Sequence, residues 1–187
     1  MHTLYLVRHA KSSWDHPGIR DFDRPLNSRG LHDAPRMGRL LNQLGVKPDL
    51  LVSSPAKRAL TTAEFFAEAF GLPATSIVQN QAVYEALPNT ILRVISQFPD
   101  AAKTVFLFGH NPTFTDVSNF FSDKHIDNLP TCGVIRIVTQ AAHWAEIQKT
   151  RKYRSPVFPP RRRCNTASSY YPDSPRSYRR STCRSAL

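Results

Sequence analysis

Residues 104–114 of the chain read Thr-Val-Phe-Leu-Phe-Gly-His-Asn-Pro-Thr-Phe, and this stretch decides the fold. The apolar run at its start predicts a buried strand. Gly109 to Pro112 interrupt the run, and apolar residues at helical spacing follow, beginning with Phe114. A buried strand that passes through a short turn into an amphipathic helix is typical of a parallel α/β sheet.

The same alternation of strand and helix extends over residues 1–148. We expect strands at 4–7, 50–52, 77–78, 104–108 and 133–138, with 143–148 as the hairpin partner of the last and 153–158 as a further strand. We expect helices beginning near residues 27, 54, 89 and 113. The pattern therefore indicates an α/β fold with a mainly parallel central sheet.

Two helix starts carry specific signals. Asn27 or Ser28 can cap the first helix, but Pro35 falls inside its pattern, so this helix either starts later or is kinked at the proline. Ser54 followed by Pro55 is typical of a cap and a first helical residue, and predicts that the second helix begins there.

The positive charge of the chain is concentrated at its end. The net charge is +11, and the segment from Lys149 onward carries eleven of the 25 Lys and Arg residues but only one of the 14 acidic ones. We therefore expect a nearly neutral folded domain at 1–158 and a basic tail at 159–187 that is rich in Arg, Ser and Pro. The tail is interpreted either as a disordered extension or as a shifted-frame translation of the gene's end.

Composition also narrows the function classes. No apolar run approaches the roughly 20 residues that span a membrane, and the first residues lack the layout of a signal peptide, so we expect a cytoplasmic protein without membrane contact. Three irregularly spaced cysteines indicate neither a disulfide framework nor a metal site. Only the tail suggests nucleic acid, and we expect from it nonspecific, salt-sensitive affinity for polyanions.

Three of the expected strands end in residues that can bind an anion. Residues 4–7 run into Arg8 and His9, the strand at 50–52 leads to a helix whose first turn carries Arg58, and residues 104–108 end at Gly109 and His110. The carboxyl ends of parallel strands share one edge, where ligand sites form. We therefore expect two imidazoles and two guanidinium groups to converge there, near helix N-termini.

This set of residues fits phosphoryl transfer. The transferring group spreads negative charge over three oxygens, which planar guanidinium groups match bidentately. A neutral imidazole can act as the nucleophile and form a labile phosphohistidine. The second imidazole, if protonated, would add a third cationic donor. This scheme requires no metal ion and no cofactor.

The residues also resemble a known family. The blocks that carry the resemblance are Leu6–Trp14, Asp23–Leu26 with Arg29 and Gly30, Ser53–Ala59, Tyr84–Ala86, Gly109–Pro112 and Leu129–Gly133. They are similar in type and order to the histidine phosphatase superfamily, in its small SixA-type phosphohistidine phosphatase branch. The resemblance covers about residues 1–148 and implies a three-layer α/β/α sandwich of the phosphoglycerate mutase-like kind.

The resemblance implies a role for each matching residue. It assigns His9 as the nucleophile, and Arg8, Arg58 and His110 as groups that bind and stabilise the phosphoryl group. We also expect phosphate contacts from Ser12, Ser13 and Asn111. Ala10 stands where many members of the superfamily have glycine, and alanine is usual in this branch.

The position of Glu85 matches a region from which larger members of the superfamily supply a general acid. An alkoxide leaving group needs such an acid, an effect of about 10²–10⁴-fold, whereas the imidazole of phosphohistidine needs less help. Glu85 is therefore either this acid or a structural, solvent-facing residue. For Asp21, Asp23 and Arg24 in the preceding loop, ion pairs that brace the loop are favoured over substrate contact.

We therefore expect a metal-independent phosphatase with a covalent phosphohistidine intermediate, acting on phosphohistidine in a phosphorylated protein. The alternatives are a small-molecule phosphomonoesterase and a noncatalytic phosphoryl-binding module. A phosphoglycerate mutase is disfavoured because the chain is short for the insertions that such enzymes place over the site. A nucleic-acid-binding function rests on the tail alone.

Overall fold

The computed structural model describes residues 1–15, 17–122, 124–148 and 152–155 of the 187-residue chain. The predicted tail at 159–187 and the end of the predicted domain at 158 lie outside the described residues. Within the described residues, one mixed sheet is the centre of the fold, with the strand order β3-β2-β4-β1-β5-β6. The predicted α/β class with a mainly parallel sheet is confirmed.

The sheet has a parallel part and an antiparallel edge. Its strands are β1 (His2–Arg8), β2 (Leu50–Ser53), β3 (Ile77–Gln79), β4 (Thr104–Gly109), β5 (Val134–Thr139) and β6 (Lys152–Ser155). β1, β2, β3 and β4 are paired in parallel, whereas β5 pairs antiparallel with both β1 and β6. β1 and β4 lie side by side at the centre, with Arg8 aligned with Gly109 at their carboxyl ends.

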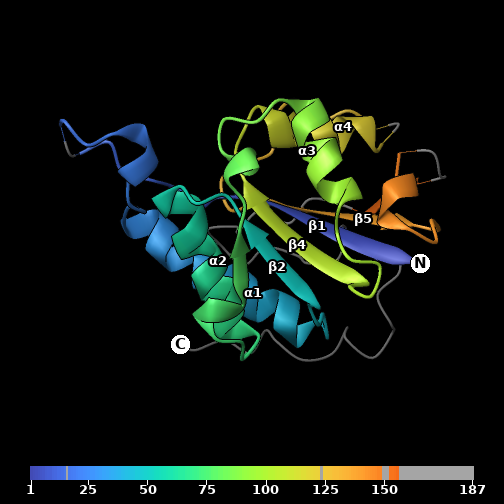
Figure 1. Cartoon of the computed structure of the whole chain (residues 1–187). Coiled ribbons are helices and arrows are strands. Elements are labelled where there is room, and N and C mark those ends of the chain that lie inside the picture. The colour runs from blue at the N-terminus through green and yellow to red at the C-terminus, as the bar shows by residue number, and fades with distance from the viewer. Residues whose placement is uncertain (16, 123, 149–151, 156–187) are drawn as a thin grey trace, which may run out of the picture.

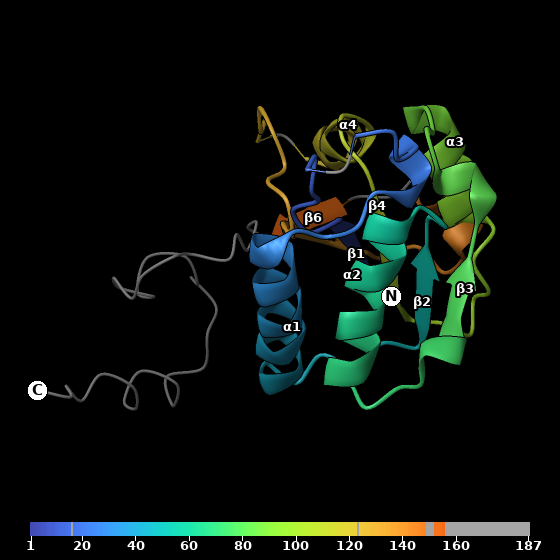
Figure 2. The same cartoon turned by 90° about the vertical axis from the view of Figure 1, so that its left-hand side faces the viewer.

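Helices cover both faces of the sheet, so the molecule has three layers (Figure 1). They are α1 (Ser28–Gln43), α2 (Lys57–Ala69), α3 (Pro88–Ser96) and α4 (Thr113–Phe120). α1 and α2 pack together on one face, and α3 and α4 lie on the other, as the turned view also shows (Figure 2). This is the predicted α/β/α sandwich.

Each face of the sheet has its own apolar core, because side chains alternate along the strands. Leu4 and Leu6 of β1 point toward the α3 and α4 side, where Trp144 is also fully buried. Tyr5 and Val7 point to the α1 and α2 side. The strands are therefore buried on both faces, and their ends have little freedom to move.

One predicted pairing is wrong. Residues 143–148 do not form the hairpin partner of β5; they contain a short 3-10 helix, Trp144–Glu146, and β6 pairs with β5 instead. The indole of Trp144 is fully buried, and its Nε1 donates to the carbonyl of Ala102. Burial of this side chain against the loop before β4 favours the helical turn over an extended strand.

Of the two helix starts with specific sequence signals, the predicted cap Asn27 is confirmed for α1, whereas the start of α2 differs from the prediction. α1 begins at Ser28, with Asn27 as its cap, and continues through Pro35, so the later start is wrong. α2 begins at Lys57, two residues after Pro55, and Ser54 is not its cap. The hydroxyl of Ser54 instead makes a contact with His110, described below.

No described helix is long and apolar enough to cross a membrane.

Gly30 supplies a testable constraint on the packing of α1. Its Cα lies so close to the main-chain carbonyl of Lys11 that a methyl group would overlap the oxygen. Gly30→Ala is therefore expected to lower the free energy of unfolding by about 1–3 kcal/mol through overpacking. It should also lower activity, because Lys11 belongs to the segment that follows His9.

The measurement is chemical denaturation, with Leu31→Ala as the matched control. Leu31 is an exposed neighbour on the same turn, so its replacement should change stability by less than about 0.5 kcal/mol. Equal stability of Gly30→Ala and the wild type would contradict this packing.

Candidate active site

The site lies at the carboxyl edge of the three adjacent strands β2, β4 and β1. The hydrogen-bond ladder continues past the strands, because the N–H of His9 donates to the carbonyl of Gly109 at 3.0 Å, and that of Ser54 donates to Phe108 at 3.0 Å. The segments that leave the three strands are thereby tied to one another. The predicted convergence of His9, His110 and Arg58 at one edge follows from this arrangement.

These residues line a cavity of about 560 Å³. Arg8, His9, Arg58 and His110 all contribute to its wall. The imidazole rings of His9 and His110 are 5.2 Å apart between centroids. Cavities of this size take small ligands or side chains.

The hydrogen bond of His9 fixes which of its nitrogens is free. Nδ1 lies 2.7 Å from the carbonyl oxygen of Ala10. Because a carbonyl only accepts, Nδ1 carries the proton and Nε2 keeps its lone pair. Burial, and to a smaller extent the charges of Arg58 and Arg8, lower the pKa of His9 from 6.5 to about 4. At neutral pH, the ring is therefore neutral, with a proton on Nδ1 and none on Nε2.

His110 is also neutral at neutral pH. Burial lowers its pKa from 6.5 to about 3, and the neighbouring His9 and Arg58 add to this shift. Its Nε2 lies 2.9 Å from the hydroxyl of Ser54. In the ligand-free protein His110 is therefore not a cationic donor, but the neutral ring can donate one N–H.

The two arginines are held by different parts of the chain. Arg8 donates through Nη1 to the carbonyl of Leu129 at 2.6 Å. Arg58 donates through both Nη atoms to Asp21, by contacts to its main chain and to its carboxylate. The side chain of Arg58 is only 8% exposed. Both guanidinium groups are thus fixed in place at the cavity wall.

Two residues of the cavity wall each have a buried nitrogen atom without a hydrogen-bond partner among the described residues. The two atoms are Nε of Arg8 and Nδ1 of His110. Buried polar groups are nearly always paired, because an unpaired one loses the free energy of its contacts with water. Arg8 and His110 therefore have hydrogen-bonding capacity that the described protein does not use.

Comparison with known proteins agrees with this geometry. The sequence profile of the histidine phosphatase superfamily (branch 1) matches residues 4–82. A putative phosphohistidine phosphatase SixA from Agrobacterium tumefaciens has a similar structure, with a TM-score of 0.70 and 30% identity, over 85% of this chain and 98% of that one. The chain belongs to the histidine phosphatase superfamily, in its SixA-type branch.

Two further relatives are named only as uncharacterized proteins. An uncharacterized chloroplastic protein of Arabidopsis thaliana is 32% identical over 152 residues, which is 76% of this chain and 69% of that protein. An uncharacterized protein of Mycobacterium tuberculosis is 29% identical over 152 residues, or 76% of this chain and 92% of that one. The superfamily and the structural likeness together support a phosphatase, that is, a hydrolase.

Not every residue predicted for the site of this phosphatase reaches the cavity. Ser12 lines it, although its hydroxyl accepts from Arg24 at 2.7 Å. Ser13 is not part of the lining, and its hydroxyl donates to Asp15 at 2.8 Å. The sequence alone could not show which of the two serine side chains lines the cavity, because the orientation of each side chain depends on the turn that follows.

Asn111 and Glu85 both line the cavity. Asn111 donates through Nδ2 to Asn128 and to the carbonyl of Leu129, so it holds the same segment as Arg8. Glu85 is exposed and has a positive φ of 51°. This backbone conformation costs free energy in a residue other than glycine, and such residues are frequent near active sites.

Sequence reasoning missed three supporting residues of this histidine phosphatase. Thr62 accepts from the N–H of Ala10 at 3.0 Å, and Ser54 contacts His110. The ring of Tyr84 lies edge-on to that of His110, with 5.8 Å between centroids. Tyr84 stands beside Glu85 in one of the blocks that carry the resemblance, but neither Thr62 nor Ser54 has a sequence signal that points to its contact.

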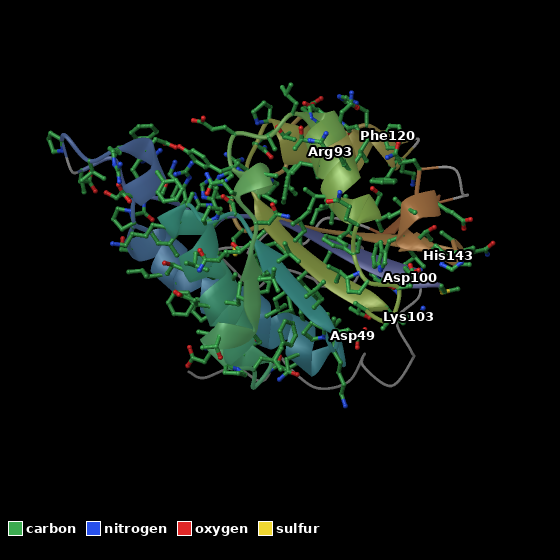
Figure 3. All side chains as sticks on the ribbon, viewed as in Figure 1. Asp49, Arg93, Asp100, Lys103, Phe120 and His143 are labelled. Carbon is green, nitrogen blue, oxygen red and sulfur yellow. The ribbon has the colours of Figure 1, made fainter. Side chains whose placement is uncertain are left out.

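The lowered pKa values give a test by NMR. The imidazoles of His9 and His110 are expected to remain neutral as the pH falls from 8 to 5. His143 is an internal control, since its hydrogen bond to Asp100 and the charge of Asp100 raise its pKa above 6.5. Figure 3 shows His143 and Asp100 together, away from the carboxyl edge of the parallel strands.

Proton binding by these two rings determines how the free energy of unfolding changes with pH. Between pH 6.5 and about 4, His9 and His110 bind fewer protons in the folded protein than in the unfolded chain. The free energy of unfolding should therefore decrease as the pH falls through this range. A titration of both rings near pH 6.5 in the ligand-free protein would contradict the burial argument.

Proposed function

We propose that the chain is a metal-independent phosphatase that removes the phosphoryl group from phosphohistidine on a protein, through a covalent intermediate on His9. The observation that carries this proposal is the free Nε2 of His9, which the contact of Nδ1 with Ala10 leaves unprotonated in a cavity walled by two guanidinium groups. A lone pair next to groups that neutralise phosphate charge is what nucleophilic attack on phosphorus needs.

The reaction has two displacements at phosphorus. First, Nε2 of His9 forms a bond to phosphorus, while the bond from phosphorus to the leaving nitrogen of the substrate breaks and that nitrogen keeps the electron pair. Second, water attacks phosphorus, the bond to His9 breaks, and inorganic phosphate and one proton are released. His9 returns to its starting form with Nδ1 still bonded to Ala10.

Arg8, Arg58 and His110 stabilise the charge that the three phosphoryl oxygens carry. The unpaired Nε of Arg8 and Nδ1 of His110 are two nitrogen atoms of the cavity wall that form no hydrogen bond among the described residues. A dianionic phosphoryl group would also raise the pKa of His110, so a proton on this ring becomes more stable when substrate binds. These groups neutralise charge without a metal ion, which supports metal independence.

The choice of phosphohistidine over an alkyl phosphate rests on Glu85. A general acid must lie within hydrogen-bond reach of the atom that it protonates. Glu85 is exposed at the rim. Phosphohistidine that is protonated on its far ring nitrogen leaves as neutral imidazole, and so requires no acid at the breaking bond.

The name of the Agrobacterium relative, putative phosphohistidine phosphatase, supports the same substrate class. A small phosphate ester remains the second candidate, because the cavity would also hold one. The described residues that line the cavity all precede residue 132, so we assign catalysis to the proposed domain at 1–158. A cytoplasmic location is part of the proposal.

Replacement of His9 tests the mechanism. In EDTA, His9→Ala is expected to reduce hydrolysis of a phosphohistidine protein and of p-nitrophenyl phosphate to background, because the nucleophile is lost. The matched control is His125→Ala, since His125 is an exposed residue whose ion pair within the described chain is with Asp127, at 3.9 Å.

Wild-type rates in EDTA should equal those without it. Loss of wild-type activity in EDTA would contradict metal independence, and full activity of His9→Ala would contradict the covalent intermediate. If the folded wild-type protein hydrolyses neither substrate, a noncatalytic phosphoryl-binding module becomes the better account.

Replacement of Glu85 tests the substrate class. Glu85→Gln is expected to change kcat/KM for phosphohistidine by less than about threefold, because no acid is needed, and an alkyl phosphate should be a poor substrate of the wild type. Glu64→Gln, on the exposed face of α2, is the control. A decrease of about 10²-fold or more, the size expected for loss of a general acid, would show that Glu85 protonates the leaving group.

A further inference from the structure

Arg58 is held from a loop that is distant in sequence. Its Nη1 donates to the main-chain carbonyl of Asp21, and its Nη2 donates to Oδ2 of the same residue at 2.8 Å. Two of the five N–H groups of the guanidinium are thereby directed to Asp21, and three remain for other acceptors. Two contacts with one residue fix the plane of the guanidinium group as well as its position.

Asp21 is itself fixed by a second arginine. Its Oδ1 accepts from Nη1 of Arg24 at 2.8 Å. Arg24 also donates to the carbonyl of Ser13 at 3.0 Å and to the hydroxyl of Ser12 at 2.7 Å. The carboxylate of Asp21 thus connects Arg58 with the segment that directly follows His9.

A third contact to Asp21 comes from Tyr84, which also lines the cavity. The hydroxyl of Tyr84 donates to Oδ2 of Asp21 at 3.2 Å, and the ring of Tyr84 packs edge-on against Phe22 and His110. Partial burial acts to raise the pKa of Asp21, but hydrogen bonds from Arg24, Arg58 and Tyr84 and the charge of Arg58 outweigh it and lower the pKa. Asp21 is therefore ionised at neutral pH.

We propose that Asp21 is a positioning residue that holds the guanidinium of Arg58 at the orientation needed to bind the phosphoryl group. This inference rests on the proposed function, in which Arg58 contacts phosphoryl oxygens. It differs from simple bracing of the loop, because it predicts an effect on catalysis that passes through Arg58. A displacement of about 1 Å in a positioned group can cost about 100-fold in rate.

The same contacts allow the opposite expectation. A carboxylate beside Arg58 could act mainly as a competing anion, and its removal would then strengthen phosphate binding. The two expectations differ in sign, so one substitution separates them.

The test compares Asp21→Asn with Asp23→Asn. Both residues lie in the same short 3-10 helix, but Asp23 pairs with Arg20 on the surface, where that arginine is 81% exposed. Each substitution removes one negative charge from the same turn, so the comparison cancels the change in net charge. Thermal unfolding of both variants establishes that they are folded at the assay temperature.

We expect Asp21→Asn to lower kcat/KM for p-nitrophenyl phosphate and for a phosphohistidine protein by about 10- to 100-fold, the size expected for a misplaced group. It should also weaken binding of inorganic phosphate. Asp23→Asn should stay within about threefold of the wild type in both measurements.

A double-mutant cycle with Arg58→Ala then shows whether the effect passes through Arg58. In the Arg58→Ala background, assayed at high enzyme concentration and by phosphate binding, Asp21→Asn should have less than about a threefold further effect. Additive losses, a tighter binding of phosphate by Asp21→Asn, or equal behaviour of Asp21→Asn and Asp23→Asn would each overturn the inference. A wild type that neither hydrolyses the substrates nor binds phosphate would instead remove the proposed function.

Discussion

The site depends on the alignment of three parallel strands at one edge of the sheet. The main-chain bonds from His9 to Gly109 and from Ser54 to Phe108 extend the ladder beyond the strands, into the segments that carry the chemistry. Because β1 and β4 are buried on both faces, these segments begin from a rigid base. Residues that are 101 positions apart, His9 and His110, can therefore face each other with 5.2 Å between ring centroids.

The electrostatic character of the site follows from its burial. Both imidazoles are removed from water and lie near guanidinium groups, so both have lowered pKa values and are neutral at neutral pH. The positive charge of the cavity lies in arginines, which cannot lose it, and Nε2 of His9, the proposed nucleophile, carries no proton. This division of roles suits a reaction in which a neutral nitrogen attacks an anion that must first be neutralised.

The sequence was sufficient to predict the α/β class and the imidazole and guanidinium groups at the strand ends, since both depend on local patterns. Arg8 and His9 follow directly after an apolar run in the sequence, and this adjacency alone places them at the end of a strand. The contacts of Ser54 and Thr62 could not be predicted from the sequence, because each joins segments that only the folded sheet brings together.

The errors have a similar origin. Ser54 and Pro55 form a local signal for a helix start, yet the hydroxyl of Ser54 contacts His110 and the helix begins at Lys57. Residues 143–148 were predicted as a strand from composition, but burial of Trp144 produces a helical turn. In both places a tertiary contact outweighs a local preference.

The central claim is that His9 carries the phosphoryl group, and trapping of the intermediate tests it most directly. The measurement is rapid quenching of the wild-type protein with a substrate labelled in the phosphoryl group, followed by mass spectrometry of the peptides. The account predicts an acid-labile label on the peptide that contains His9, absent from the peptide that contains His110. A label on another residue, or turnover in which no label on His9 can be trapped at any quench time, would contradict it.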